Sequence, residues 1–110
     1  MEKKTKEQIL EELGGLPEEL YDELVASFIE NAQNQFIELE KAISGNDSVS
    51  ISKIAHSLKG SSANLRLGNI QELASFVEKS AKEGLSLNEF QGKIGELINA
   101  VLELKKQHDK

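Results

Sequence analysis

Apolar residues between positions 20 and 43 recur at intervals of three and four, and no proline or glycine interrupts them. This spacing predicts a long amphipathic helix with one buried stripe. Pro17 is tolerated in the first helical turn, and Gly45 with Asn46 ends the pattern. We expect the stripe to consist of Leu20, Leu24, Val25, Phe28, Ile29, Ala32, Phe36, Leu39 and Ile43.

Three further amphipathic helices are expected after the long one. The first begins within a run of capping residues and ends at Gly68, because glycine suits the position just past a helix. The next two begin at pairs with capping-box spacing, Asn69 with Glu72 and Ser86 with Glu89.

A short helix is expected before the long one, at residues 5–13, since Thr5 and Gln8 form another capping-box pair. Short connections between long amphipathic helices make sequential neighbours antiparallel. We therefore predict an all-α fold, an antiparallel up-down four-helix bundle over residues 17–106 with the short extra helix at its N-terminal side. One domain of residues 1–110 is the expectation at this length, and Met1 with the polar C-terminus favours an intact small protein.

The formal net charge of −6 and the single arginine argue against a protein that binds phosphate backbones, so no nucleic-acid partner is expected. The chain has no cysteine, which excludes disulfides and thiolate chemistry and fits a reducing compartment. No apolar run approaches the ~18 residues of a membrane span, and the N-terminal residues lack an apolar signal segment. We expect a cytoplasmic monomer with no membrane partner.

One histidine lies inside the third helix, within the sequence IAHSLKGSSANLRLG. A helix turns by about 100° per residue, which places Ala55 and Leu58 within about 60° of Ile51 and His56 near 140°. The imidazole is therefore expected to face outward. Gly60 shares this exposed face, where glycine costs about 1 kcal/mol relative to alanine, so its missing side chain leaves room for a group to approach the ring.

Lys59 lies three residues after His56, close enough for its ammonium to reach a group attached to the imidazole. A neutral imidazole is nucleophilic, and a nearby cation stabilises a dianionic phosphoryl group that the ring accepts. The alternative is an ordinary surface histidine, which is the commoner case on a helix.

Other chemistries find less support in the sequence. A metal site needs several convergent ligands, and the second histidine, His108, is expected to be a solvated tail residue. A hydrolase of the triad type needs an activated nucleophile, whereas Ser57, Ser61 and Ser62 fit helix-surface or backbone-bonding roles. The phosphate loop G-x-x-x-x-G-K-[ST] is absent, so ATP binding by that route is not expected. We expect no metal and no cofactor on this chain.

The segment AHSLKGSSANL resembles the active-site helix of histidine-containing phosphotransfer (HPt) domains. The resemblance covers residues 16–65, which are similar in order and spacing to the family's second and third helices. It implies that His56 accepts a phosphoryl group from the aspartate of response-regulator receiver domains and returns it, with a hybrid sensor histidine kinase as a further partner. It also implies a carrier without ATP-binding or autokinase activity, with Mg²⁺ only on the receiver.

The same resemblance suggests roles for the neighbours of the histidine. Lys59 would contact the phosphoryl group, Gly60 would keep the approach open, and Ser61 and Ser62 match the small supporting residues that usually follow. Glu78 falls where the family often has Gln or Glu. We hypothesise that its carboxylate accepts from one ring nitrogen and leaves the other nucleophilic; the alternative is an exposed helix carboxylate with no role.

Arg66 departs from the family pattern, which usually has glycine soon after the SSANL run. If that glycine serves a left-handed helix end, Arg66 would be strained there by about 1 kcal/mol or more, so we expect the helix to continue and turn at Gly68. Arg66 and Ala63 are assigned to the partner surface. The competing function, from a different class, is a non-catalytic helical adaptor that binds a receiver or kinase without phosphoryl transfer.

Overall fold

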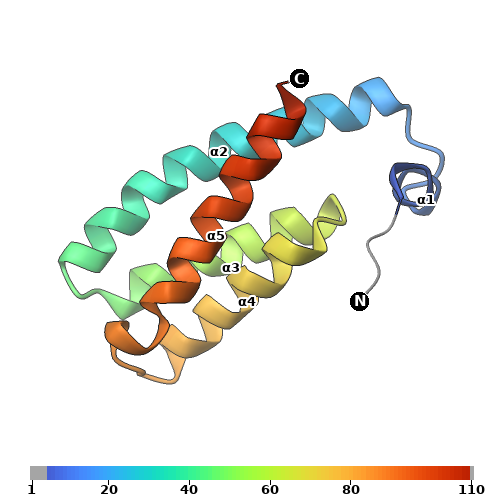
Figure 1. Ribbon diagram of the computed structural model, residues 1–110. Helices are drawn as coiled ribbons and strands as arrows, with labels where there is room; N and C mark the ends of the chain where they lie inside the picture. The colour runs from blue at the N-terminus through green and yellow to red at the C-terminus, as the bar shows by residue number, and fades with distance from the viewer. Residues whose placement is uncertain (1–4, 110) are drawn as a thin grey trace.

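The computed structural model describes residues 5–109, and in that part of the chain the regular secondary structure is helical, without a strand (Figure 1). The predicted domain of residues 1–110 includes residues 1–4 and 110, which lie outside the described part. The prediction of an all-α fold is confirmed. The helices are α1 (Lys6–Glu12), α2 (Glu18–Ser44), α3 (Ser48–Asn64), α4 (Gly68–Lys82) and α5 (Leu87–His108).

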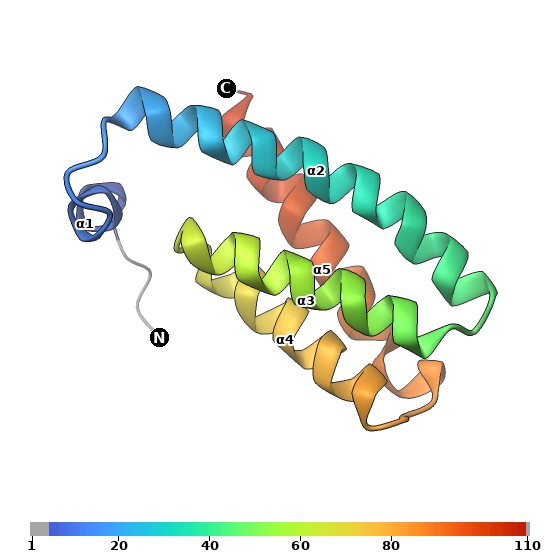
Figure 2. The same cartoon turned by 180° about the vertical axis from the view of Figure 1, so that it is seen from behind.

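The four longer helices contact one another in a closed ring, in the order α2, α3, α4, α5 and back to α2. Helices α3 and α4 lie side by side in both views, and α1 lies beyond the turn that joins them (Figures 1 and 2). The finer expectation, an up-down arrangement of the four, stays a prediction. The buried apolar residues form one core, which comprises Tyr21, Val25, Phe28, Ile29, Ala32, Phe36, Leu39, Ala42, Ile51, Ala55, Leu58, Leu65, Ile70, Ala74, Val77, Ala81, Phe90, Ile94, Leu97 and Val101.

Helix α2 is longer than the helices opposite it. Its 27 residues correspond to about 40 Å, whereas the 17 residues of α3 correspond to about 26 Å. The N-terminal part of α2 therefore extends past the end of α3, and the short helix α1 lies at this end of the molecule (Figure 2). The Nζ atom of Lys6 in α1 pairs with carboxylates of α2, at 2.7 Å from Asp22 and 3.0 Å from Glu18.

The capping box at the start of α1 is confirmed, with Thr5 and Gln8 exchanging both predicted hydrogen bonds. The two later boxes are wrong in detail. Asn69 lies inside α4, which begins at Gly68 and has no side-chain cap. Ser86 occupies the expected position before α5 but makes no side-chain capping bond.

The predicted stripe on α2 is correct along its middle and wrong at its N-terminal end. Leu20 and Leu24 are 42% and 43% exposed, while Tyr21 between them is buried. The tyrosine hydroxyl donates a hydrogen bond of 2.6 Å to the carbonyl oxygen of Leu65 at the end of α3. The overhang of α2 explains the difference, because α3 does not extend along its first turns.

The turn between α3 and α4 contradicts the prediction for Arg66 and Gly68. Helix α3 ends at Asn64, and Arg66 itself takes the left-handed conformation with φ of 58°. The backbone N–H of Leu67 then donates to the carbonyl oxygen of Ser62 at 2.9 Å, which satisfies a carbonyl at the helix end. Arg66 thus occupies the position that usually favours glycine, and Gly68 is the first residue of α4 instead of a helix stop.

Candidate phosphoryl-transfer site on α3 and α4

His56 lies in the middle of α3 and faces solvent. Its side chain is 68% exposed, and the neighbouring Ala55 and Leu58 are each 1% exposed in the core. These two core residues fix the rotation of α3, because a helix that buries them turns position 56 outward. The predicted orientation of the imidazole is confirmed.

Glu78 is brought against this ring by the packing of α4 on α3. The residue is only 5% exposed, although glutamate is rarely buried without partners. One of its carboxylate oxygens, Oε2, lies 2.8 Å from Nδ1 of His56. The alternative of an exposed glutamate is therefore wrong, and the contact required by the tautomer hypothesis is present.

Two lysines complete the surroundings of the buried carboxylate. Lys59 places its Nζ 2.5 Å from Oε1 of Glu78, and Lys82, one turn further along α4, places its Nζ 3.0 Å from Oε2. The hydrogen bond from Lys59 is the main cause that lowers the pKa of Glu78 from 4.5 to about 2, against the opposing effect of burial. Glu78 is accordingly ionised at neutral pH.

The ionised carboxylate decides which ring nitrogen carries the proton. A carboxylate without a proton can only accept hydrogen bonds, so Nδ1 of His56 must be the donor. In the neutral imidazole the lone pair then resides on Nε2, the second nitrogen of a largely exposed ring. The arrangement presents a nucleophilic nitrogen to solvent, and two lysine ammonium groups lie on the carboxylate that the ring contacts.

Gly60 follows one helical turn after the ring and is exposed. A Cβ added there would meet nothing within 4 Å beyond its own helical turn, among the residues that the structure describes. Packing inside the chain therefore does not require glycine at this position. The open surface is consistent with the expectation that Gly60 leaves the approach to the ring free.

The two serines that follow have different surroundings. Ser62 is fully buried, and its hydroxyl lies 2.7 Å from the carbonyl oxygen of Leu58 and 3.0 Å from that of Lys59. Ser61 is exposed and lines a groove. Ser62 therefore supports the helix backbone, which is one of the roles expected for it.

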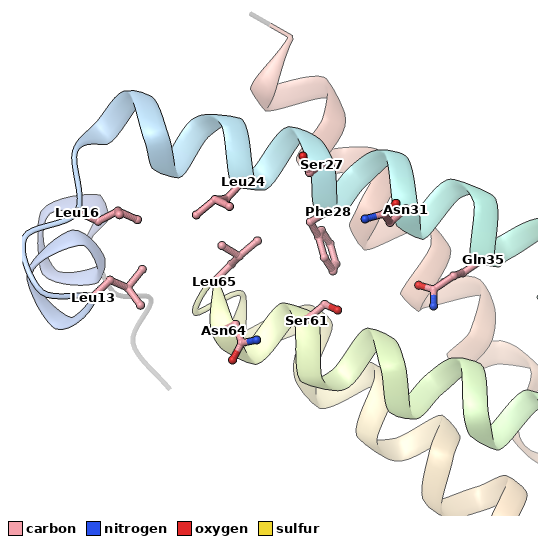
Figure 3. A pocket seen from close by; sticks show the side chains of 10 residues that line it. All are labelled: Leu13, Leu16, Leu24, Ser27, Phe28, Asn31, Gln35, Ser61, Asn64 and Leu65. Carbon is pink, nitrogen blue, oxygen red and sulfur yellow. The ribbon is translucent and has the colours of Figure 1, made fainter.

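The groove lies between the N-terminal half of α2, the end of α3 and the segment that joins α1 to α2 (Figure 3). Its volume is about 420 Å³, and leucines from all three segments point into it. This groove explains why Leu24 is exposed. The lining residues are Leu13, Leu16, Leu24, Ser27, Phe28, Asn31, Gln35, Ser61, Asn64 and Leu65.

The residues assigned to the partner surface lie at the end of α3. Ala63 and Arg66 are both half-buried, and Nη1 of Arg66 donates to the carbonyl oxygen of Ala63 at 2.9 Å. The guanidinium also lies 3.8 Å from the carboxylate of Glu12 in α1. These contacts connect Arg66, a residue of the α3–α4 turn, with α1, and its role in partner binding stays a prediction.

Sequence reasoning missed Lys82 and misplaced His108. The i, i+4 spacing from Glu78 was the available signal for Lys82, since such residues are neighbours on a helix. His108 is not a solvated tail residue, because its Nε2 lies 3.0 Å from the carbonyl oxygen of Asp22. In residues 5–109 no group of three or more His, Cys, Asp or Glu side chains could hold a metal ion. No helix in this range is long and apolar enough to cross a membrane.

Comparison with known proteins gives one match. The family model described as Hpt domain covers residues 23–107, from the first turns of α2 to the end of α5. It includes His56, Lys59, Glu78 and Lys82. No curated protein and no solved structure matches the chain significantly.

Proposed function

The chain belongs to the Hpt domain family of phosphotransfer modules, and on this premise we propose that it carries a phosphoryl group on His56 in a two-component phosphorelay. Its partners in this proposal are response-regulator receiver domains, a hybrid sensor histidine kinase, or both. The protein acts as a cytoplasmic monomer, with the up-down four-helix bundle as a rigid scaffold for the site.

The observation that carries the proposal is the contact of 2.8 Å between Nδ1 of His56 and the buried carboxylate of Glu78. A surface histidine with no function has no need of a buried, ionised partner. Glu78 fixes the ring and its tautomer, and the helix core fixes Glu78, so Nε2 is held in one direction before a partner arrives.

The proposed step balances as a simple displacement. The Nε2 lone pair attacks the phosphorus of a receiver phospho-aspartate, and the P–O bond to the aspartate breaks with its electron pair leaving on that carboxylate. Nδ1 keeps its proton, so the phosphorylated ring carries a positive charge, which the carboxylate of Glu78 opposes. An ammonium group from the lysines that hold Glu78 stabilises the negative phosphoryl oxygens. The reverse step returns the group to an aspartate.

The protein itself supplies neither ATP binding nor a metal in this proposal. Hpt domains are phosphocarrier modules and not ATP-binding kinases. The Mg²⁺ ion needed at the acyl phosphate belongs to the receiver, and this chain contributes positioning and charge.

The test is the transfer of radioactive phosphate from purified phosphorylated receiver domains to the full chain. We expect an acid-labile, base-stable label on the wild-type protein and none on His56→Gln, with the same helical circular dichroism for both. The variant keeps the size and polarity of the side chain and removes only the nucleophile. A protein that binds receivers without acquiring label would instead be a helical adaptor, and the proposed function would be wrong.

A further inference from the structure

Lys59 and Lys82 hold the same carboxylate in unequal ways. Lys59 has a side chain that is 33% exposed and lies 2.5 Å from Oε1 of Glu78. Lys82 is 64% exposed, lies 3.0 Å from Oε2, and shares that oxygen with Nδ1 of His56. The second lysine is therefore both the more weakly held and the more accessible from solvent.

The two carboxylate oxygens would also respond differently to the loss of a lysine. Lys59 supplies the one hydrogen bond to Oε1 found within residues 5–109, so its departure would leave a buried anionic oxygen without a donor. Oε2 keeps the bond from His56 if Lys82 leaves. Burial thus restrains Lys59 and leaves Lys82 free to exchange partners.

We propose that Lys82 is the phosphoryl-binding cation of this site, and that it moves from Oε2 of Glu78 to the phosphoryl oxygens when His56 is phosphorylated. Lys59 stays on Oε1 and acts as a positioning residue for Glu78. This inference rests on the proposed function, and it reassigns the contact with the phosphoryl group that the family resemblance gave to Lys59.

The charge change during transfer supplies the reason for the movement. When Nε2 bonds to phosphorus and Nδ1 keeps its proton, the ring becomes cationic and replaces Lys82 as the positive partner of Oε2. At the same moment a phosphoryl dianion appears on the far side of the ring and attracts a cation. Lys82 has a flexible four-carbon stem with its ammonium in solvent, so it can follow the charge without any change in the backbone.

The test uses the full chain and potassium phosphoramidate, a small donor that requires no protein partner. Nε2 attacks the phosphorus of the donor in its N-protonated form, the P–N bond breaks, and its electron pair leaves with the nitrogen as ammonia. We compare Lys82→Gln with Lys79→Gln, an exposed lysine in the same last turn of α4. Lys79 follows Glu78 directly and so points about 100° away from it, which makes it a matched control for charge.

We expect Lys82→Gln to slow the labelling of His56 about tenfold with only a small fall in melting temperature, because this lysine is 64% exposed, and Lys79→Gln to label like the wild type. Lys59→Gln should lower the melting temperature as well as the rate. Normal labelling of Lys82→Gln would overturn the role of Lys82 and leave the proposed function intact. Absence of label on His56 in the wild type would overturn both.

A second measurement follows the lysines themselves. In protein labelled with ¹⁵N on the lysine side chains, we expect the ammonium signal of Lys82 to shift on phosphorylation and that of Lys59 to stay. The opposite pattern would return the phosphoryl contact to Lys59. This measurement uses the wild-type protein, so a purely structural effect of the Lys82→Gln substitution cannot produce its result.

Discussion

Tyr21 and Leu65 are 44 residues apart in the chain and are joined by a buried hydrogen bond of 2.6 Å from the tyrosine hydroxyl to the leucine carbonyl oxygen. The bond connects the first turns of α2 with the residue that caps α3. Arg66, in the left-handed conformation, follows directly. The bond therefore fixes the position of the α3–α4 turn against α2, and with it the helix that carries Glu78.

Tyr21→Phe should lower the free energy of unfolding by about 1 kcal/mol, because the ring still fills the core while the carbonyl oxygen of Leu65 loses its buried donor. Urea unfolding of the two proteins measures the difference. Burial raises the pKa of the Tyr21 hydroxyl above its usual 10. The hydroxyl therefore contributes fully to the free energy of unfolding below pH 10, and this contribution is lost as the pH rises through the higher pKa of the folded state. The free energies of unfolding of the two proteins should converge at alkaline pH. A constant gap across this range would contradict the assignment.

The left-handed conformation of Arg66 predicts an unusual order of stabilities. Arg66→Gly and Arg66→Ala both remove the guanidinium and its contacts with Ala63 and Glu12. They differ in that only glycine adopts φ of 58° without steric cost. We expect the glycine variant to be more stable than the alanine variant by about 1 kcal/mol in chemical unfolding. Equal stabilities would show that α3 does not end as described.

Hydrophobic spacing was enough to predict the long helices and the outward direction of His56, because both depend only on helical geometry and on which face is buried. Leu20 and Leu24 were misassigned since spacing does not reveal that the partner helix is shorter. Their exposure follows from the overhang of α2 past α3, and Leu24 also lines the groove at this end. The apolar pattern of one helix does not show how long the neighbouring helix is.

The predicted position of the α3–α4 turn is wrong for a different reason. Local preference places glycine, and not arginine, at a left-handed helix end, so the sequence predicts the turn at Gly68. Contacts between distant segments override that preference here, among them the bond from Tyr21 to Leu65. The burial of Glu78 was likewise unresolved from sequence, because it depends on how α4 packs against α3 and not on the pattern within α4.

Glu78 should make the free energy of unfolding depend on pH in the acidic range. Its folded pKa of about 2 lies below the usual 4.5, so the unfolded state binds the proton first and the stabilising effect of the carboxylate is complete only above pH 4.5. It is lost as the pH falls towards 2. Glu78→Gln resembles the protonated side chain at every pH, so the wild type should exceed it in stability by about 2 kcal/mol near neutrality, after allowing for solvent screening at Lys82.

Urea unfolding of the wild type and Glu78→Gln from pH 7 to pH 3 measures this loss, and the difference between them should shrink along the series. Glu83→Gln, which changes an exposed carboxylate at the end of the same helix, controls for the change in net charge. A gap between the wild type and Glu78→Gln that stayed constant down to pH 3 would mean that the carboxylate is not held by the lysines and the ring.

Gly60 should separate stability from function. Its helical position is open, so Gly60→Ala should raise the free energy of unfolding by up to about 1 kcal/mol. The added methyl group lies on the exposed face one turn from His56, where the proposed function brings a receiver close to the ring. We therefore expect a more stable protein that accepts phosphate more slowly from a phosphorylated receiver, with a smaller loss when phosphoramidate is the donor.

Gly95→Ala is the matched control, because Gly95 is also helical, exposed and open but belongs to α5. It should gain similar stability and accept phosphate from the receiver at the wild-type rate. The comparison uses chemical unfolding for stability and the initial rate of label transfer for function. If Gly60→Ala accepted label as fast as Gly95→Ala, the glycine would have no part in the approach to His56, and a partner surface elsewhere around the ring would have to be sought.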